Sequence, residues 1–210
     1  VHKGEMVVLA GPNGAGKSTL LRLIFCDEFP TSGQILVNGR TTVRMKPRAI
    51  PYLRRTMGIV FQDFKLIRNR TIEENLALVA LVAGGTTIQA RQKVAQLLKL
   101  VGLSHKAQMV PCKLSNSEQQ RVAMARAMMN DPLILLADEP TGNLDAEQAA
   151  DAVRLLFEIN AQGTTVLVAT HNLKLAEEAG CRTVFLKQGR IVEEWQRVNR
   201  PTGSAQQKRV

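Results

Sequence analysis

Long apolar runs are missing from this sequence. The longest nearly uninterrupted one, residues 76–83, has eight residues, whereas a membrane-spanning helix needs about 20, and no charged-then-apolar leader opens the chain. We therefore expect a protein that does not cross a membrane by itself. Cysteine is also scarce: Cys26, Cys112 and Cys181 are odd in number, far apart and in no C-x-x-C pair. This argues against a disulfide framework and a zinc site, and it favours a reducing cytosol.

Acidic residues are outnumbered by basic ones, with 18 Asp and Glu against 28 Lys and Arg and a net charge of +10. Such a chain favours polyanions: nucleotide phosphates, nucleic acid or an acidic lipid surface. The imbalance is steepest in residues 40–70, which hold nine bases and one acid, a net charge of +8. A solvated surface, an anionic partner and acidic lipid headgroups would each account for this stretch, and charge alone does not choose among them.

Apolar segments of strand and helix type alternate along the 210 residues, of which 45% are apolar, enough for the core of a domain. The predicted strands are residues 6–10, 35–37, 57–61, 133–137 and 165–169. The predicted helices follow residue 17 and span residues 72–103, 117–130 and 146–161. This alternation predicts an α/β fold with a parallel sheet covered by helices on both faces.

A glycine-rich motif lies between the first strand and the first helix. Residues 11–18 fit G-x-x-x-x-G-K-[ST], the P-loop of nucleotide-binding proteins. Glycines let the backbone fold around phosphate oxygens, so that successive N–H groups point at negative charge. Lys17 adds a cation for the β and γ phosphates, and the Ser18 hydroxyl holds Mg²⁺. The predicted ATP phosphate-binding residues are Gly11, Pro12, Asn13, Gly14, Ala15, Gly16, Lys17, Ser18 and Thr19.

Two adjacent acids end the buried strand at residues 133–137. Asp138 should lie at the carboxyl edge of the sheet, where ligands of open α/β sheets bind, and can reach the Mg²⁺ shell. In an extended chain, Glu139 would point to the opposite side, where it could orient and deprotonate the water that attacks the γ-phosphate. The sequence thus predicts a P-loop NTPase that uses ATP and Mg²⁺.

Three further segments narrow this prediction, namely Phe61-Gln62-Asp63, the run Leu-Ser-Asn-Ser-Glu-Gln-Gln-Arg at residues 114–121, and His171 after the last strand. In this order they resemble an ABC-type ATPase, and the resemblance extends to about Trp195. It implies Gln62 as the Q-loop residue that contacts Mg²⁺ and water, Asp145 as the D-loop residue, and His171 as the switch histidine. It also implies a signature that contacts the ATP of a second subunit, so that ATP joins a homodimer. The signature residues are Ser115, Asn116, Ser117, Glu118 and Gln119.

Within that class, residues 51–58, 61–67 and 137–145 resemble the FtsE family of bacterial cell-division ATP-binding proteins. The resemblance implies a cytoplasmic ATPase, peripheral on the inner face of the bacterial cell membrane. Its partner would be a polytopic membrane protein of FtsX type, through which ATP switches on cell-wall hydrolases outside, and no specific nucleic acid is expected. Phe64, Leu66 and Ile67 are the apolar residues expected to grip a partner helix. Residues 76–83 would lie behind them, unless they only pack the helical insert.

The resemblance also implies the domain plan. We expect an ABC nucleotide-binding domain over residues 1–195 with a helical insert at about residues 72–130, followed by a mobile basic tail at residues 196–210. The domain lacks the two N-terminal strands of the family. No Phe, Tyr or Trp precedes Lys17 to stack on adenine, and the first residue is not Met, so we expect that an upstream segment is missing.

The signature departs from the family pattern Leu-Ser-Gly-Gly, because Asn116 and Ser117 replace the two glycines. Side chains there can crowd the partner's phosphate, so we expect slow hydrolysis and weak ATP-driven dimerisation. Three alternatives stay open: a lipoprotein-release or efflux ABC ATPase, a non-hydrolysing nucleotide-binding scaffold, and an ATP-gated DNA-binding protein. The Asp-Phe-Lys-Leu run at residues 63–66 favours FtsE over the first, and the lack of sustained heptads for a coiled coil disfavours the last.

Overall fold

A six-stranded sheet forms the centre of the computed structural model, which describes residues 1–172 and 180–195. Its strand order is β4-β5-β6-β1-β7-β8, in which neighbours from β4 to β7 are parallel and β8 is antiparallel to β7. The strands are β1 (Met6–Ala10), β4 (Met57–Val60), β5 (Ile134–Asp138), β6 (Thr165–Thr170), β7 (Arg182–Lys187) and β8 (Arg190–Trp195). A separate hairpin joins β2 (Leu36–Val37) to β3 (Arg40–Thr41). The predicted basic tail at residues 196–210 lies outside the described residues.

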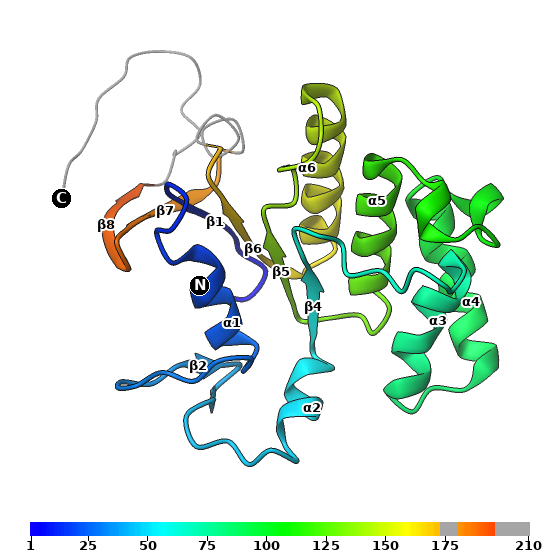
Figure 1. The fold of residues 1–210 in the computed structure, drawn as a ribbon. Helices are drawn as coiled ribbons and strands as arrows, with labels where there is room; N and C mark the ends of the chain where they lie inside the picture. Colours follow the sequence, from blue (N-terminus) through cyan, green and yellow to red (C-terminus); the bar gives the residue numbers. More distant parts are fainter. Residues whose placement is uncertain (173–179, 196–210) are drawn as a thin grey trace.

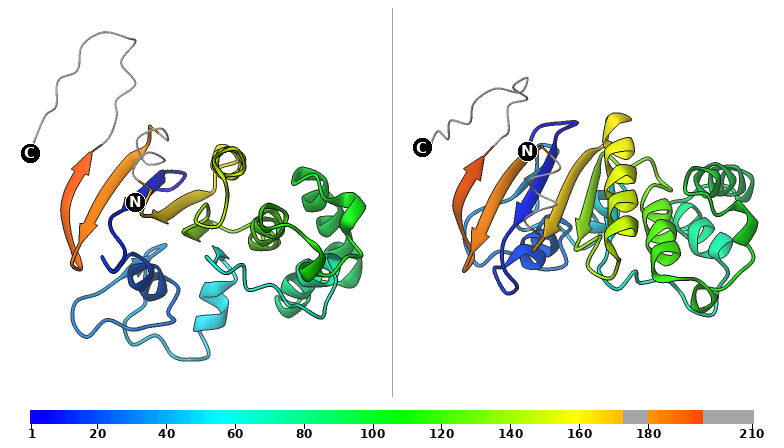
Figure 2. Two further views of the ribbon diagram at one scale, coloured as in Figure 1. Left: turned by 45° about the horizontal axis from the view of Figure 1, so that its top comes forward. Right: turned by 90° about the horizontal axis from the view of Figure 1, so that it is seen from above.

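Helices cover both faces of this sheet, as the sequence predicts (Figure 1). Figure 2 shows α1 and α2 on one face and α5 and α6 on the other, with α3 and α4 beyond α5 and away from the sheet. The helices are α1 (Lys17–Ile24), α2 (Ile50–Arg54), α3 (Ile72–Val82), α4 (Thr87–Leu100), α5 (Asn116–Ala127) and α6 (Ala146–Ala161), with 3₁₀ turns at Ser104–Lys106 and Pro111–Lys113. Among the described residues, no helix has both the length and the apolar character needed to span a bilayer.

Strand β1 shows why the sheet needs a layer on each side. All five of its residues are buried, and successive side chains of a strand point to opposite faces. Val7 and Leu9 join the apolar cluster that includes Leu21 of α1, whereas Val8 belongs to the cluster that includes Leu156 of α6. This double burial accounts for the continuous apolar run at residues 6–10, which is typical of parallel sheets.

Residues 72–103, the first part of the helical insert, form two helices where the sequence pattern predicts one continuous segment. Thr71 and Thr86 each begin a helix with a capping box, in which a side chain three residues later binds back to the cap's backbone N–H. Gly84 and Gly85 separate the two helices, since glycine is the poorest helix former after proline. Helix α4 buries Val94 and its neighbours against the core, which makes the insert part of the same packed unit.

The sequence analysis missed four elements: α2, β3, β7 and β8. Helix α2 has five residues and β3 has two, which is too short for a periodic signal. Strand β8 is exposed at nearly all of its positions, so it shows no pattern of buried apolar residues from which a strand could be predicted. The signal for the last hairpin was Gln188-Gly189, a turn in which both residues have positive φ, 50° and 73°. Apart from residues 72–103, the remaining predicted strands and helices are confirmed, with ends that differ by at most three residues.

The contact between β4 and α5 depends on one glycine and gives a stability prediction. A Cβ on Gly58 would overlap the backbone carbonyl of Ala127 at the end of α5 and approach Leu135 Cδ1 to 3.0 Å. We expect Gly58→Ala to lower the free energy of unfolding by about 1–3 kcal/mol, because the strand and helix must move apart. Urea unfolding measures this. Gly142→Ala is the control, since its Cβ would meet atoms no closer than 3.5 Å; equal losses in both variants would contradict the overlap.

Candidate active site

The P-loop wraps around the side chain of Lys17 at the start of α1. The lysine Nζ donates to the carbonyl oxygens of Gly11 at 2.8 Å and Pro12 at 3.2 Å. The side chain is only 6% exposed. Its charge is therefore held inside the loop, at the helix N-terminus where phosphate oxygens bind in such motifs.

The hairpin of β7 and β8 supports the P-loop from one side. Gly189 N donates to Ala15 O at 2.9 Å. Any Cβ on Gly11 would overlap the backbone carbonyl of Leu186, so only glycine allows the loop to lie this close to β7. The loop conformation thus depends on residues about 175 positions later in the chain.

Ser18 and Asp138 lie side by side, as the prediction of a shared Mg²⁺ requires. Ser18 Oγ donates to Asp138 Oδ1 at 3.0 Å. Burial raises the pKa of the Asp138 carboxyl, and the hydrogen bond from Ser18 works in the opposite direction. Among the described residues, no group of three or more His, Cys, Asp or Glu side chains could hold a metal ion. A hydroxyl beside a carboxylate fits a hard ion such as Mg²⁺, which takes few protein ligands and relies on substrate phosphates for others.

Glu139 is a buried carboxylate that lies between the side chains of Lys17 and His171. Its Oε1 lies 3.4 Å from Lys17 Nζ, its Oε2 lies 2.9 Å from His171 Nδ1, and the residue is 8% exposed. Despite this short distance, Oε2 accepts no hydrogen bond in the part of the chain that the structure describes. An acceptor without a donor beside the P-loop lysine suits the predicted role of Glu139 as a general base for water.

The backbone at Glu139 corrects one expectation. The chain is not extended there, because Glu139 has φ of +46°, in the left-handed region. This conformation costs a non-glycine residue about 1 kcal/mol or more and is common at functional sites. Two hydrogen bonds maintain it, from Glu139 N to Ala169 O at 2.8 Å and from Gly142 N to Glu139 O at 3.1 Å.

Gln62 and Asp145 lie near the loop that follows β5. The Gln62 carbonyl accepts a hydrogen bond from Asn143 Nδ2 at 3.1 Å, and the amide of Gln62 lies close to Gly142. This brings the Q-loop to the segment that carries Glu139. Asp145 caps α6, where its Oδ1 accepts from Gln148 N at 2.9 Å. The catalytic role predicted for Gln62 and the D-loop role predicted for Asp145 stay predictions.

The signature residues begin α5, away from the P-loop of the same chain. Ser115 is the N-cap and forms a capping box with Glu118, which also binds Lys106. Ser115 Oγ lies 3.1 Å from Ser117 Oγ. Within residues 1–172 and 180–195, no hydrogen bond or ion pair joins residues 115–119 to residues 11–19. The predicted action of the signature on a second subunit's ATP stays a prediction.

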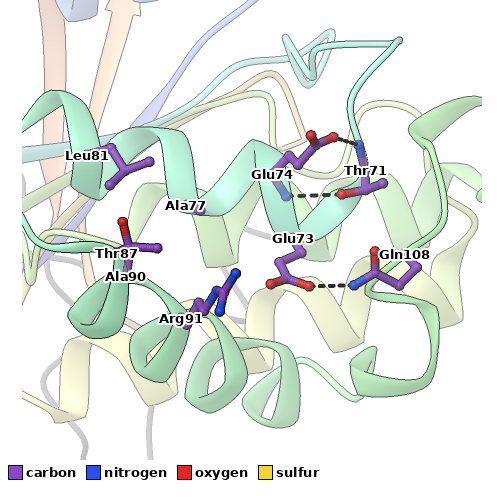
Figure 3. A pocket seen from close by; sticks show the side chains of 9 residues that line it. All are labelled: Thr71, Glu73, Glu74, Ala77, Leu81, Thr87, Ala90, Arg91 and Gln108. Carbon is purple, nitrogen blue, oxygen red and sulfur yellow. Dashed lines mark hydrogen bonds between the residues drawn. The ribbon is translucent and has the colours of Figure 1, made fainter.

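A surface hollow of about 450 Å³ lies between α3 and α4 (Figure 3). Figure 3 shows Leu81 and Ala77 of α3 along its edge, and Glu73 bound to Gln108 at 2.5 Å. It contains none of the residues predicted to bind ATP. Its lining residues are Thr71, Glu73, Glu74, Ala77, Leu81, Thr87, Ala90, Arg91 and Gln108.

Comparison with known proteins decides the family. The sequence model of the ABC transporter family matches residues 1–142, which hold the P-loop, Gln62, the signature and the two acids after β5. This chain belongs to the ABC transporter family. The resemblance stated from the motifs is thereby confirmed, and the chain is the ATP-binding, ATP-hydrolysing subunit type of that family. ABC ATPases bind ATP with Mg²⁺.

Within the ABC family the chain is similar to cell division ATP-binding proteins FtsE. It is 47% identical to that of Mycobacterium tuberculosis over 94% of this chain and 86% of the relative, and 44% identical to that of Bacillus subtilis over 92% and 85%. The fold matches the ATP-binding cassette MJ0796, solved as a dimer in a post-hydrolysis state bound to ADP and phosphate. The TM-score is 0.86, with 35% identity over 95% of this chain and 88% of that one. The predicted fold class is confirmed.

Three side chains of this ABC site were missed by the sequence analysis. Arg126 donates to the carbonyl oxygens of Phe64 and Lys65, which follow Gln62 and with it form the Q-loop. Lys106 binds Glu118 of the signature, and Asn143 binds Gln62. Asn143 stands in the recognised run at residues 137–145 and could have been found there. No local signal marks Arg126 or Lys106, because their partners are distant in sequence or in another element.

Proposed function

We propose that this chain is the ATPase subunit of a bacterial cell-division complex of FtsE and FtsX type. It would convert ATP-driven dimerisation into movement of a polytopic membrane partner that controls cell-wall hydrolases. The buried group of Lys17, Glu139 and His171 at the P-loop supports the ATPase part of this proposal. The similarity to FtsE proteins of several bacteria supports the cell-division part.

The residues of the site would act as follows. Lys17 exchanges its loop carbonyls and Glu139 for the phosphate oxygens of ATP. Ser18, Asp138 and Gln62 would hold Mg²⁺, which neutralises charge on the β and γ phosphates. Glu139, once released from Lys17, orients the attacking water and accepts its proton. His171 then lies next to the acid, where it can hold the carboxylate in place.

A second copy of the chain would complete the site. In this proposal, residues 115–119 contact the γ-phosphate bound to the partner's P-loop, so ATP stabilises the closed dimer. Hydrolysis removes these contacts and lets the dimer open, which is the conformational output. The dimeric cassette MJ0796 supports this assembly.

The membrane partner would dock beside the Q-loop. Phe64 and Leu66 pack partly into the protein's own core, whereas Ile67 is exposed and its backbone binds Asn75 of α3. From the apolar run at residues 76–83, Leu76 is buried in the core and Leu78, Leu81 and Val82 are exposed. The surface proposed to bind a partner helix is therefore smaller than the sequence suggests. It consists of Ile67 and the exposed side of α3.

We propose a cytoplasmic, peripheral location on the inner face of the cell membrane. Four basic side chains of the β3–α2 region, Arg40, Arg44, Lys46 and Arg48, are exposed and have no acidic partner among the described residues. Such charges suit the acidic inner leaflet, where each contributes about 1 kcal/mol near the surface.

The signature gives a prediction of its own. We expect Asn116→Gly with Ser117→Gly to raise both the ATPase rate and the ATP-driven dimer fraction, because less bulk faces the partner's phosphate. One better-placed donor to the phosphate can give about a hundredfold in rate. A steady-state ATPase assay, with a sizing run in the Glu139→Gln background, measures the two effects. Equal rates and dimer fractions would show that these positions tolerate side chains.

The experiment that tests the proposal is a partner exchange in membranes. The Glu139→Gln protein is incubated with ATP and Mg²⁺ and with membranes that carry either an FtsX-type protein or a lipoprotein-release or efflux-type ABC membrane protein. We expect ATP-dependent retention on the first membranes, and none for Lys17→Ala. Retention on the second kind only would favour the alternative transporter, and ATP binding without hydrolysis or retention would favour the nucleotide-binding scaffold. A DNA affinity that falls steeply with salt would favour the DNA-binding alternative.

A further inference from the structure

We propose that Arg126 is a positioning residue that fastens the Q-loop to the helix that starts at the signature. The inference rests on the proposed function, because it concerns how the signature and Gln62 are coordinated in the ATPase cycle. Arg126 lies near the end of α5, and the Q-loop follows β4, 61 and 62 residues earlier in the chain.

The guanidinium group binds two consecutive carbonyl oxygens. Arg126 Nη2 donates to Phe64 O at 2.7 Å, and Nη1 donates to Lys65 O. The forked, planar group of arginine can reach two acceptors at once, whereas a lysine ammonium has no such fixed pair of donors. Burial lowers the pKa of Arg126 and nearby Asp63 opposes this, but an arginine stays charged at neutral pH.

The two carbonyls belong to an unfavourable backbone turn. Phe64 and Lys65 have φ of +60° and +51°, so two neighbouring non-glycine residues are in the left-handed region. Such residues persist only where the surrounding structure holds them. Within the loop, Phe64 N donates to Phe61 O at 3.0 Å and Lys65 N to Asp63 O at 2.6 Å. Arg126 binds the turn from outside the loop, which ties this conformation to the position of α5.

Gln62 lies between this turn and a second attachment. Its carbonyl binds Asn143 in the loop that carries Glu139, and the turn two residues later binds Arg126. Gln62 is thus connected through Asn143 to the loop that carries Glu139, and through the turn at Phe64 and Lys65 to Arg126 of α5. Helix α5 has 12 residues and spans about 18 Å at 1.5 Å per residue. A shift of the signature at its first turn is therefore carried along a rigid element to the Q-loop.

The test replaces Arg126 by Gln and, separately, by Lys. We expect Arg126→Gln to lower kcat by about 10- to 100-fold, the range that misplacement of an active-site group by about 1 Å can produce. The KM for ATP and the ATP-driven dimer fraction in the Glu139→Gln background should change less than twofold, since neither the P-loop nor the signature is altered. Arg126→Lys should be intermediate, because it restores the charge and one donor. The matched control is Arg91→Gln on exposed α4, with unchanged kinetics.

Hydrogen exchange gives a readout that does not depend on turnover. In Arg126→Gln, backbone amides of residues 63–67 should exchange faster, while those of residues 117–125 keep the protection of the parent protein. Unchanged exchange in the Q-loop together with unchanged kcat would overturn the proposal. Loss of protection throughout α5, or loss of the dimer, in both Arg126 variants would also overturn it, in favour of a general structural role. If the parent protein hydrolyses no ATP, the proposed function fails, yet the exchange measurement still decides whether Arg126 holds the loop.

Discussion

Replacing Lys17 by alanine is expected to abolish tight ATP binding. The lysine is the only cation that the structure places inside the P-loop among the described residues, with its Nζ on the carbonyls of Gly11 and Pro12. Truncating one partner of a buried charge pair costs about 2–5 kcal/mol. The dissociation constant for Mg·ATP should therefore rise roughly 30- to several thousandfold.

A direct titration of Mg·ATP, by calorimetry or with a fluorescent analogue, measures the loss. Lys99→Ala is the matched control, because Lys99 is an exposed lysine of α4 far from the loop. Removing Lys17 also leaves Glu139 buried without its ion pair, so the thermal stability of the variant is measured in parallel. Unchanged nucleotide affinity in a folded Lys17→Ala protein would remove the P-loop assignment.

Changing Glu139 to glutamine is expected to stop turnover while keeping ATP binding. The carboxylate is the buried group beside Lys17 that can accept a proton, and glutamine keeps its size without that ability. Loss of a general base lowers rates by about 10²- to 10⁴-fold. Nucleotide affinity should not fall, because the Glu139 carboxylate, which pairs with Lys17, no longer competes with the phosphates for that lysine.

The measurement is a steady-state ATPase assay beside a nucleotide titration. Glu147→Gln is the control, since Glu147 is exposed in the first turn of α6. His171→Ala should lower the rate in the same direction but less completely, because His171 contacts the base and is itself half exposed. Normal turnover in Glu139→Gln would place the base elsewhere.

Much of the fold followed from the sequence where the signal is local and strong. The run at residues 6–10 is buried on both faces and therefore continuously apolar, and the prediction of β1 is confirmed residue for residue. Helix α6 likewise has its predicted bounds, residues 146–161. Strand β8 could not be found in this way, because its stability comes from pairing with β7 and its side chains face solvent.

The candidate site was predicted residue by residue, but its internal connections were not. Motif spacing names Lys17, Glu139 and His171, yet it does not show that Glu139 contacts both of the others. The same holds for the left-handed backbone at Glu139. Tertiary contacts determine these features, so the pattern of residues adjacent in the sequence does not predict them.

The support of the P-loop by the β7–β8 hairpin has a consequence for biosynthesis. Residues 11–18 leave the ribosome before Leu186 and Gly189, which pack on the loop and follow about 170 residues later. At about 5–20 residues per second, the interval is on the order of ten to thirty seconds. Strand β1 also cannot pair in the sheet until its two neighbours, β6 and β7, have been synthesised. The nascent chain therefore carries the P-loop motif without its complete support until residues 186–189 have also been made.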